Sequence, residues 1–235
     1  MAKVPALYEG SFMNIQRLEL LTVDLQAQQD FYSNILALST KFTDLGLEIQ
    51  VGTTELVFIQ APSDFEDAYH FAFNIPENQY YSAKQWISSR TPLLRDRTGK
   101  EDFHSDSWNS DSIYFLDAAG NVLEFIARHN LQNAVKEDFD SRQILNISEI
   151  GLPSEDVILL ADRLCRRLGV SVYKQEPNEN FTPVGDEEGL FILPVKDRIW
   201  MPDSGVPARL LPIKARGDVA GKLWQVRGVP YIIAG

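Results

Sequence analysis

The sequence predicts an α+β fold in which a strand–helix–strands unit, βαβββ, recurs and forms a curved, cup-shaped mixed sheet. One observation is a repeated block that begins at Arg17, His70 and Glu149. Each block opens on a polar residue, carries apolar residues at its second and fourth places, and has an acid at its eighth. The other observations are a helical pattern after each acid and short apolar runs after each helix. Because such a unit cannot bury its own sheet face, we expect copies to pair around a concave, ligand-binding face.

The first unit begins with alternation from Arg17 to Asp24, which is typical of a strand with one buried face. Asp24 suits a helix N-terminus, where its side chain accepts backbone amide protons. The apolar residues that follow fall close to one helix face: Leu25, Phe31, Ile35 and Leu36. Strands are then expected over residues 46–51 and 55–60.

The second unit repeats this order from His70, with Glu77 in the place of Asp24. Its helical pattern consists of Tyr80, Ala83, Trp86 and Ile87. Strands are expected over residues 112–116 and 121–127, joined by a hairpin turn at 118–120. A long polar insert, residues 95–109, comes before them and contains Phe103 and Trp108.

The third unit has the clearest helix, which we expect to start at Asp156 and to end at Gly169. Its buried face would consist of Val157, Leu160, Ala161, Leu164 and Leu168. Strands are expected over residues 170–173, 181–184 and 189–195. The pattern then weakens into strands over 209–215 and 223–233, without a full fourth unit.

Composition excludes several classes of protein. The 235 residues carry a formal net charge of −11, which argues against binding to nucleic acid or to anionic lipid. A single cysteine, Cys165, excludes an internal disulfide and a thiolate zinc site. The sequence has no run of 18 apolar residues, and residues 1–11 lack the apolar core of a signal peptide. We therefore expect a cytoplasmic protein.

Two stretches carry a family resemblance. Residues 17–38 combine a strand, an Asp-Leu helix start and the aromatic pair Phe31-Tyr32. Residues 111–125 combine a strand, a turn that ends at Gly120-Asn121, and a second strand with Glu124 between apolar neighbours. In this order they resemble the vicinal oxygen chelate superfamily, which includes glyoxalase I, extradiol ring-cleaving dioxygenases, and the fosfomycin and bleomycin resistance proteins. The resemblance implies the glyoxalase/bleomycin resistance/dioxygenase fold. We expect a paired domain over residues 14–130, and a third unit with an incomplete C-terminal half over residues 143–235.

The resemblance also implies a divalent metal ion, Zn, Fe, Mn or Ni, at the centre of the cup, with ligands from the first and last strand of each unit. The matching positions in this sequence are Arg17, Phe58, His70 and Glu124. His70 and Glu124 are the expected metal-binding and catalytic pair, and Phe58 is expected to contact the ligand. Arg17 cannot coordinate a metal, because a guanidinium has no free lone pair to donate. A zinc site normally has at least three protein ligands, so either another residue completes the set, with His104 and His129 as candidates, or the site is not metallic. Without a metal, His70 and Glu124 would be a general acid and base or a hydrogen-bonded structural pair.

Two further residues admit two interpretations each, and a third has one. Arg17 either binds a substrate carboxylate or phosphate, or forms a salt bridge with Glu124 or Glu19 in place of a metal. Trp108 either packs on a ligand as part of a lid formed by the insert, or anchors a surface loop. Glu149 occupies the first-strand ligand position of the third unit and is interpreted as structural.

Three functions remain open from the sequence. The leading hypothesis is a metal-dependent lyase, isomerase or ring-cleaving dioxygenase with a degenerate metal site. The second is a metal-free protein that binds a small molecule, as bleomycin resistance proteins do. The third is a structural protein that has kept the fold and lost the site. In the first two cases the expected partner is a small molecule, and the protein is expected to be a monomer or homodimer.

Overall fold

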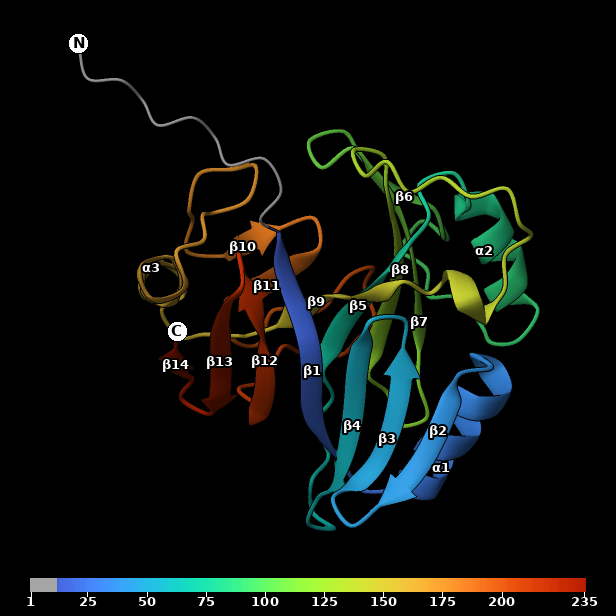
Figure 1. The fold of residues 1–235 in the computed structure, drawn as a ribbon, viewed down its shortest axis with the longest axis horizontal. Helices are drawn as coiled ribbons and strands as arrows, with labels where there is room; N and C mark the ends of the chain where they lie inside the picture. Colours follow the sequence, from blue (N-terminus) through green and yellow to red (C-terminus); the bar gives the residue numbers. More distant parts are fainter. Residues whose placement is uncertain (1–11) are drawn as a thin grey trace.

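Two seven-stranded sheets form the core of the computed structural model, which describes residues 12–235. The expectation about a signal peptide in residues 1–11 lies outside this range. We name the sheets A and B. Sheet A has the order β14-β13-β12-β1-β4-β3-β2, and sheet B has the order β10-β11-β9-β5-β8-β7-β6. Figure 1 shows β1 in the middle of sheet A, between β12 and β4. This architecture is the α+β, cup-shaped fold that the sequence predicts.

The first two units contain the expected strands and helices. The first unit consists of β1 (Met13–Thr22), α1 (Leu25–Asp30), the π-helical turn η1 (Phe31–Ile35), β2 (Ser39–Thr43), β3 (Gly46–Val51) and β4 (Thr54–Gln60). The second consists of β5 (His70–Ile75), α2 (Tyr80–Ser88), β6 (Phe103–Ser105), β7 (Ser110–Leu116) and β8 (Val122–Arg128). The short strands β2 and β6 were not predicted, because they are too polar to show an apolar pattern.

The remaining chain forms one more unit and a hairpin-like end. After the 3₁₀ turn η2 (Ser141–Gln143), the third unit contains β9 (Asn146–Gly151), α3 (Val157–Leu168), β10 (Phe181–Asp186) and β11 (Gly189–Pro194). The end consists of β12 (Ile213–Val219), β13 (Lys222–Gly228) and β14 (Ile232–Ala234). The strand expected over 170–173 is wrong, since Val172 makes only an isolated bridge to Val184.

Two of the three expected helix caps are present. Asp24 and Asp156 each accept a hydrogen bond at 2.9 Å, from the backbone N–H groups of Ala27 and Leu159. Glu77 was wrongly placed at a helix start, because α2 begins three residues later, after Gln79.

The pairing of the units differs from the expectation that the first two share one sheet. Instead, β1 pairs antiparallel with β12, and β5 pairs antiparallel with β9. Each sheet therefore combines strands from residues 14–130 with strands from residues 143–235. Gly217 permits the close approach of β12 to β1, because a Cβ at this position would lie 1.7 Å from the carbonyl oxygen of Asn14. Because the sequence contains no complete fourth unit, it does not identify β12 as the partner of β1.

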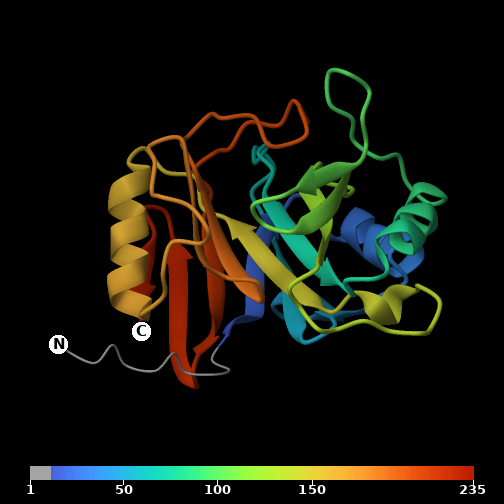
Figure 2. The ribbon, with the colours of Figure 1, turned by 90° about the horizontal axis from the view of Figure 1, so that it is seen from above.

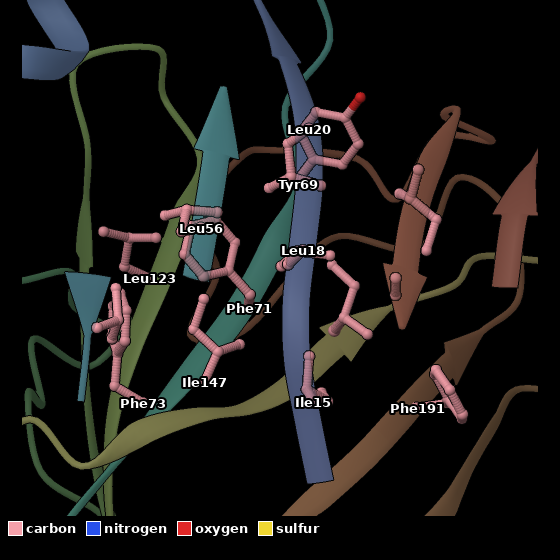
Figure 3. Close-up of a cluster of buried hydrophobic side chains, with 14 of the residues drawn as sticks. Ile15, Leu18, Leu20, Leu56, Tyr69, Phe71, Phe73, Leu123, Ile147 and Phe191 are labelled. Carbon is pink, nitrogen blue, oxygen red and sulfur yellow. The ribbon is translucent and has the colours of Figure 1, made fainter. Parts of the chain in front are cut away.

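The main hydrophobic cluster lies where sheet A packs against sheet B. Figure 3 shows part of this cluster, in which the drawn side chains include Leu18 and Leu20 of β1, Phe71 and Phe73 of β5, and Ile147 of β9. Because side chains alternate along a strand, the neighbours of these core residues point to the opposite face of each sheet. The functional side chains described next lie on that opposite face of sheet B.

Candidate metal centre

Three buried side chains from neighbouring strands of sheet B meet at one point. His70 lies on β5, Glu124 on β8 and Glu149 on β9, and each is less than 7% exposed. Ala72 explains the juxtaposition, because it pairs with Glu124 on one side and with Glu149 on the other. His70 stands two residues before Ala72 and shares its face. One potential ligand atom of each residue lies within 4.8 Å of the other two.

A β-bulge aims Glu149 into this cluster. Ala72 pairs with Glu149, but the next residue of β5, Phe73, pairs with Ile147, so Ser148 is the extra residue. A bulge changes which face a side chain occupies and is common beside functional sites. As a result Ile147 and Ile150 enter the core, while Glu149 reaches the cavity.

The imidazole of His70 has a fixed orientation. Its Nδ1 lies 3.0 Å from the carbonyl oxygen of Val122, which can only accept, so Nδ1 carries the proton. Burial lowers the pKa of His70 to about 4, and the ring is therefore neutral at pH 7. Its other nitrogen, Nε2, presents a lone pair 3.7 Å from Oε2 of Glu124. Metal-binding histidines are commonly held by such a bond from the second ring nitrogen.

The carboxyl of Glu124 is destabilised as an anion. Burial and the neighbouring charge of Glu149 raise its pKa to about 8, although hydrogen bonds with Ser112 and Tyr114 act in the opposite direction. The metal-free site therefore favours a proton on Glu124 at neutral pH. A cation in the same place would relieve both the desolvation and the repulsion.

Arg128 supplies one permanent positive charge behind the cluster. It lies at the end of β8, is fully buried, and forms an ion pair with Glu149. Its Nε donates to Oδ1 of Asn74 at 3.1 Å, and its Nη1 has no hydrogen-bond partner among residues 12–235. Arg128 balances one of the two carboxylates and leaves the other without a cation.

A cavity of about 240 Å³ opens onto all three residues of the cluster. One side is covered by the loop between β11 and β12, which we call the lid loop, residues 195–212. Trp200 of this loop lies over His70, with a ring-centroid separation of 4.7 Å. Gly151 makes room for the indole, because a Cβ there would lie 2.6 Å from its Cη2 atom. In the view of Figure 2 the lid loop and the insert rise on the same side of the molecule.

The structure places the other predicted site residues as follows. Trp108 lines the cavity and packs edge-on against Tyr173, with ring centroids 5.2 Å apart. Phe58 is fully buried in the core beside Tyr32 and does not line this cavity. Arg17 lies on sheet A, where its Nε donates to Glu19 at 2.8 Å and its Nη1 contacts Glu55. Of its two predicted salt-bridge partners, Glu19 is therefore found and Glu124 is not.

The histidines proposed as a third ligand lie outside the buried cluster. His104 and His129 both contact Asp111, each at 2.8 Å, on the outer part of β7. The residue that sequence reasoning missed is Glu149. The available signal was that Glu149 opens its block, as His70 does. Its partners could not be identified, because the third unit was expected to have no fourth unit to pair with.

Comparison with known proteins shows the fold. No family model and no curated protein matches the sequence. A putative dioxygenase from Bacillus subtilis subsp. subtilis str. 168 superposes with a TM-score of 0.58 and 17% identity, over 91% of this chain and 68% of that one. Glyoxalase I from Zea mays gives 0.50 and 14%, over 78% and 66%. A mutant of the maize enzyme gives 0.53 and 12%, over 79% and 68%. The chain thus spans about two thirds of each of these proteins and has a glyoxalase- and dioxygenase-like fold.

None of the helices within residues 12–235 combines the length and the apolar character that a membrane-crossing helix needs.

Proposed function

We propose that this protein is a metal-dependent enzyme acting on a small molecule, and that His70, Glu124 and Glu149 hold one divalent metal ion. The observation that carries the proposal is the lone pair of a buried, neutral imidazole aimed at two buried carboxylates. Such a group needs a proton or a cation at its centre, because two carboxylates in a medium of low dielectric repel each other strongly.

The donor set fits a divalent metal. One imidazole nitrogen and two carboxylate oxygens suit Fe²⁺, Mn²⁺, Zn²⁺ or Ni²⁺, and three protein ligands is the usual number in catalytic zinc sites. The hydrogen bond from His70 to Val122 leaves the Nε2 lone pair free for coordination. Because the cavity reaches all three residues, a substrate within it would lie beside the same ion.

The surrounding residues define what the chain contributes to catalysis. A bound metal would polarise substrate oxygens as a Lewis acid. Glu124 must release its proton when a cation enters, because a coordinating carboxylate is deprotonated. Tyr114 and Ser112 hold its carboxyl in place, and Trp200 excludes water from the His70 side of the cavity. The reaction class is a lyase, isomerase or ring-cleaving dioxygenase step.

A metal-free binding protein is the second candidate. The ion pair between Arg128 and Glu149 favours it, since a built-in cation already neutralises one carboxylate. In this case a protonated Glu124 would donate a hydrogen bond to His70 or to a ligand.

Metal titration decides between these candidates. Protein prepared without a histidine tag and stripped with a chelator is titrated with Mn²⁺, Zn²⁺, Ni²⁺ and, without oxygen, Fe²⁺. We expect one equivalent to bind per chain, and His70→Ala and Glu149→Gln to weaken binding by at least about a hundredfold. Glu55→Gln, which removes a carboxylate from sheet A, is the matched control and should bind as the unmodified protein does. If no metal binds in stoichiometric amount, or if His70→Ala binds normally, the metal-free candidate replaces the proposal.

A further inference from the structure

Arg198 of the lid loop lines the cavity without an acidic partner. Its guanidinium lies 5.0 Å from the ring centroid of Phe181, and its Nη1 donates to the carbonyl oxygen of Asn180 at 3.3 Å. Arg209 on the same loop contacts two carboxylates, Asp197 and Asp67, whereas no carboxylate within residues 12–235 forms an ion pair with Arg198. In a chain with 33 acids and 22 bases, a cation left unpaired at a cavity is available to bind an anion.

Arg198 is also the only lysine or arginine among the described residues that line this cavity. His104 lies at the same rim, but its two ring nitrogens contact Asp111 and Asp106 and are not free. At the floor of the cavity, the carboxylate of Glu149 is already paired with Arg128. The cavity therefore has one site for one negative charge.

The walls and the size define the rest of the ligand. The walls are mainly apolar and aromatic, and include Phe103, Trp108, Phe181, Ile192, Trp200 and Met201. A cavity of about 150 Å³ suffices for benzene, and drug-sized ligands occupy roughly 300 Å³ or more. At about 240 Å³, this cavity fits one aromatic ring with a short substituent.

The lid loop carries the charge and the cover of the cluster close together along the chain. Trp200 lies over His70, and Arg198 stands two residues before it on a segment that pairs with residues 206–208 through backbone hydrogen bonds. Two residues of extended chain separate the Cα atoms of Arg198 and Trp200 by about 7 Å. Because Arg198 and the His70 cluster line the same cavity, one ligand within it can contact both.

We propose that the cavity binds an aromatic monocarboxylate, with its carboxylate on Arg198 and its ring against Trp200 and Phe181. The inference rests on the proposed function only in assigning the far end of the ring to the His70–Glu124–Glu149 cluster. A ligand with two carboxylates would need a second free cation, which the described lining does not provide. Arg198 is thus the specificity-determining residue of the lid loop.

Paired probes test the charge directly. Benzoate, phenylacetate and 3-phenylpropionate are compared with benzyl alcohol, 2-phenylethanol and 3-phenylpropanol, which keep the ring and lose the charge. Binding is followed by the fluorescence of Trp108 and Trp200 and by saturation-transfer NMR. We expect at least one acid to bind about tenfold more tightly than its alcohol, and the chain-length series to show a single optimum. If no acid binds, or if acid and alcohol bind equally, the inference is overturned.

Variants then assign the preference to Arg198. Arg198→Gln should remove about tenfold in affinity for the acid and leave the affinity for the alcohol unchanged, and Arg198→Lys should restore part of the difference. Arg227→Gln, which removes an exposed arginine from β13, is the matched control. An equal loss in Arg227→Gln, or no loss in Arg198→Gln, contradicts the assignment.

The metal question is separated by repeating the titrations with chelator-treated protein. The preference for the acid is expected to persist there, because Arg198 supplies the charge. Failure of metal binding with a retained acid preference would overturn the proposed function alone. Normal metal binding without an acid preference would overturn this inference alone.

Discussion

Sheets A and B carry side chains of opposite electrostatic character at corresponding strand positions. In sheet B, the first strands of two units supply His70 and Glu149, and the last strand of one supplies Glu124. In sheet A, the position of His70 is occupied by Arg17, which contacts Glu19 and Glu55. Place in the fold alone therefore does not decide whether a cluster can hold a metal. Under the proposed function, what decides it is whether the chain already provides the cations that its carboxylates need.

The two clusters also differ in their access to water. In sheet A, the side chain of Glu55 is 35% exposed, and Lys214, which also pairs with Glu19, is 44% exposed. Two cations therefore meet two acids beside solvent that screens them. In sheet B, two buried acids share one arginine, and their repulsion is not screened. The two carboxylates of sheet A are thus neutralised by two cations near solvent. The two carboxylates of sheet B share one arginine, so a further cation would stabilise them.

The largest expected effect comes from removing the arginine of each cluster. Arg128→Met should lower the free energy of unfolding by about 3–5 kcal/mol, because Glu149 is left buried without its partner. Arg17→Met should cost about 1 kcal/mol or less, since its partners are nearer to water. Urea denaturation of the chelator-treated proteins measures both losses. Equal losses would show that the two clusters do not differ in the way described.

A double variant separates the loss of charge pairing from the loss of packing around Arg128. Arg128→Met combined with Glu149→Gln removes both charges of the ion pair, so that no unpaired carboxylate is left at position 149. The double variant should regain most of the stability lost in Arg128→Met alone. If the double variant is as unstable as the single one, the loss comes from packing around Arg128 and not from charge.

The next effect is a dependence on pH that belongs to sheet B. Burial and the charge of Glu149 raise the pKa of Glu124 to about 8 in the folded protein, whereas the unfolded chain releases this proton near the ordinary pKa of 4.5. The pKa of His70, lowered from 6.5 to about 4, contributes stability that grows as pH rises to 6.5. The two contributions oppose each other below pH 6.5. Of these two groups only Glu124 titrates above pH 6.5, and through it metal-free protein should lose up to roughly 1.4 kcal/mol per pH unit between pH 6.5 and 8.

Glu124→Gln is the control for this pH dependence. It removes the titrating group and should give a nearly flat stability between pH 6.5 and 8, measured by urea denaturation with chelator present. Glu19→Gln in sheet A should leave the slope of the unmodified protein intact. Unmodified protein whose stability stays constant or rises over this range would contradict the raised pKa.

The smallest effect is expected at the rim of sheet A. Lys214→Ala breaks a half-exposed ion pair with Glu19 and should cost less than about 1 kcal/mol, and the loss should shrink further at high salt. Thermal denaturation at low and high salt measures it. A loss as large as that of Arg128→Met would mean that the sheet A cluster is not effectively screened by water.

Much of the fold follows from local sequence signals. The alternation after Arg17 and His70, and the caps at Asp24 and Asp156, place the main strands and helices close to their observed positions. The local signals do not predict which units share a sheet. For example, β5 pairs with β9, but the sequence of neither strand indicates which strand lies next to it. The apolar pattern predicts that one face of a strand is buried, but it does not predict which element packs against that face.

The candidate site could be predicted in part. His70 and Glu124 stand where the resemblance places them, and the structure brings them together. Glu149 required knowledge of a bulge at Ser148. Phe58 was placed at the site, but it pairs with Leu20 on the core face, while its neighbour Val57 pairs with Glu19 on the other. A shift of one residue exchanges the two faces of a strand, so an alignment uncertain by one residue cannot assign such a position.

Cobalt spectroscopy tests most directly the claim that sheet B alone holds a metal. Co²⁺ is added to chelator-treated protein and to the variants Glu149→Gln and Glu55→Gln, and the visible absorption of the bound ion is recorded. We expect one equivalent of Co²⁺ with the same spectrum in the unmodified protein and in Glu55→Gln, and a lost or altered spectrum in Glu149→Gln. Unchanged Co²⁺ spectra in all three proteins would contradict it, because the ion would then lie away from the cluster of His70, Glu124 and Glu149.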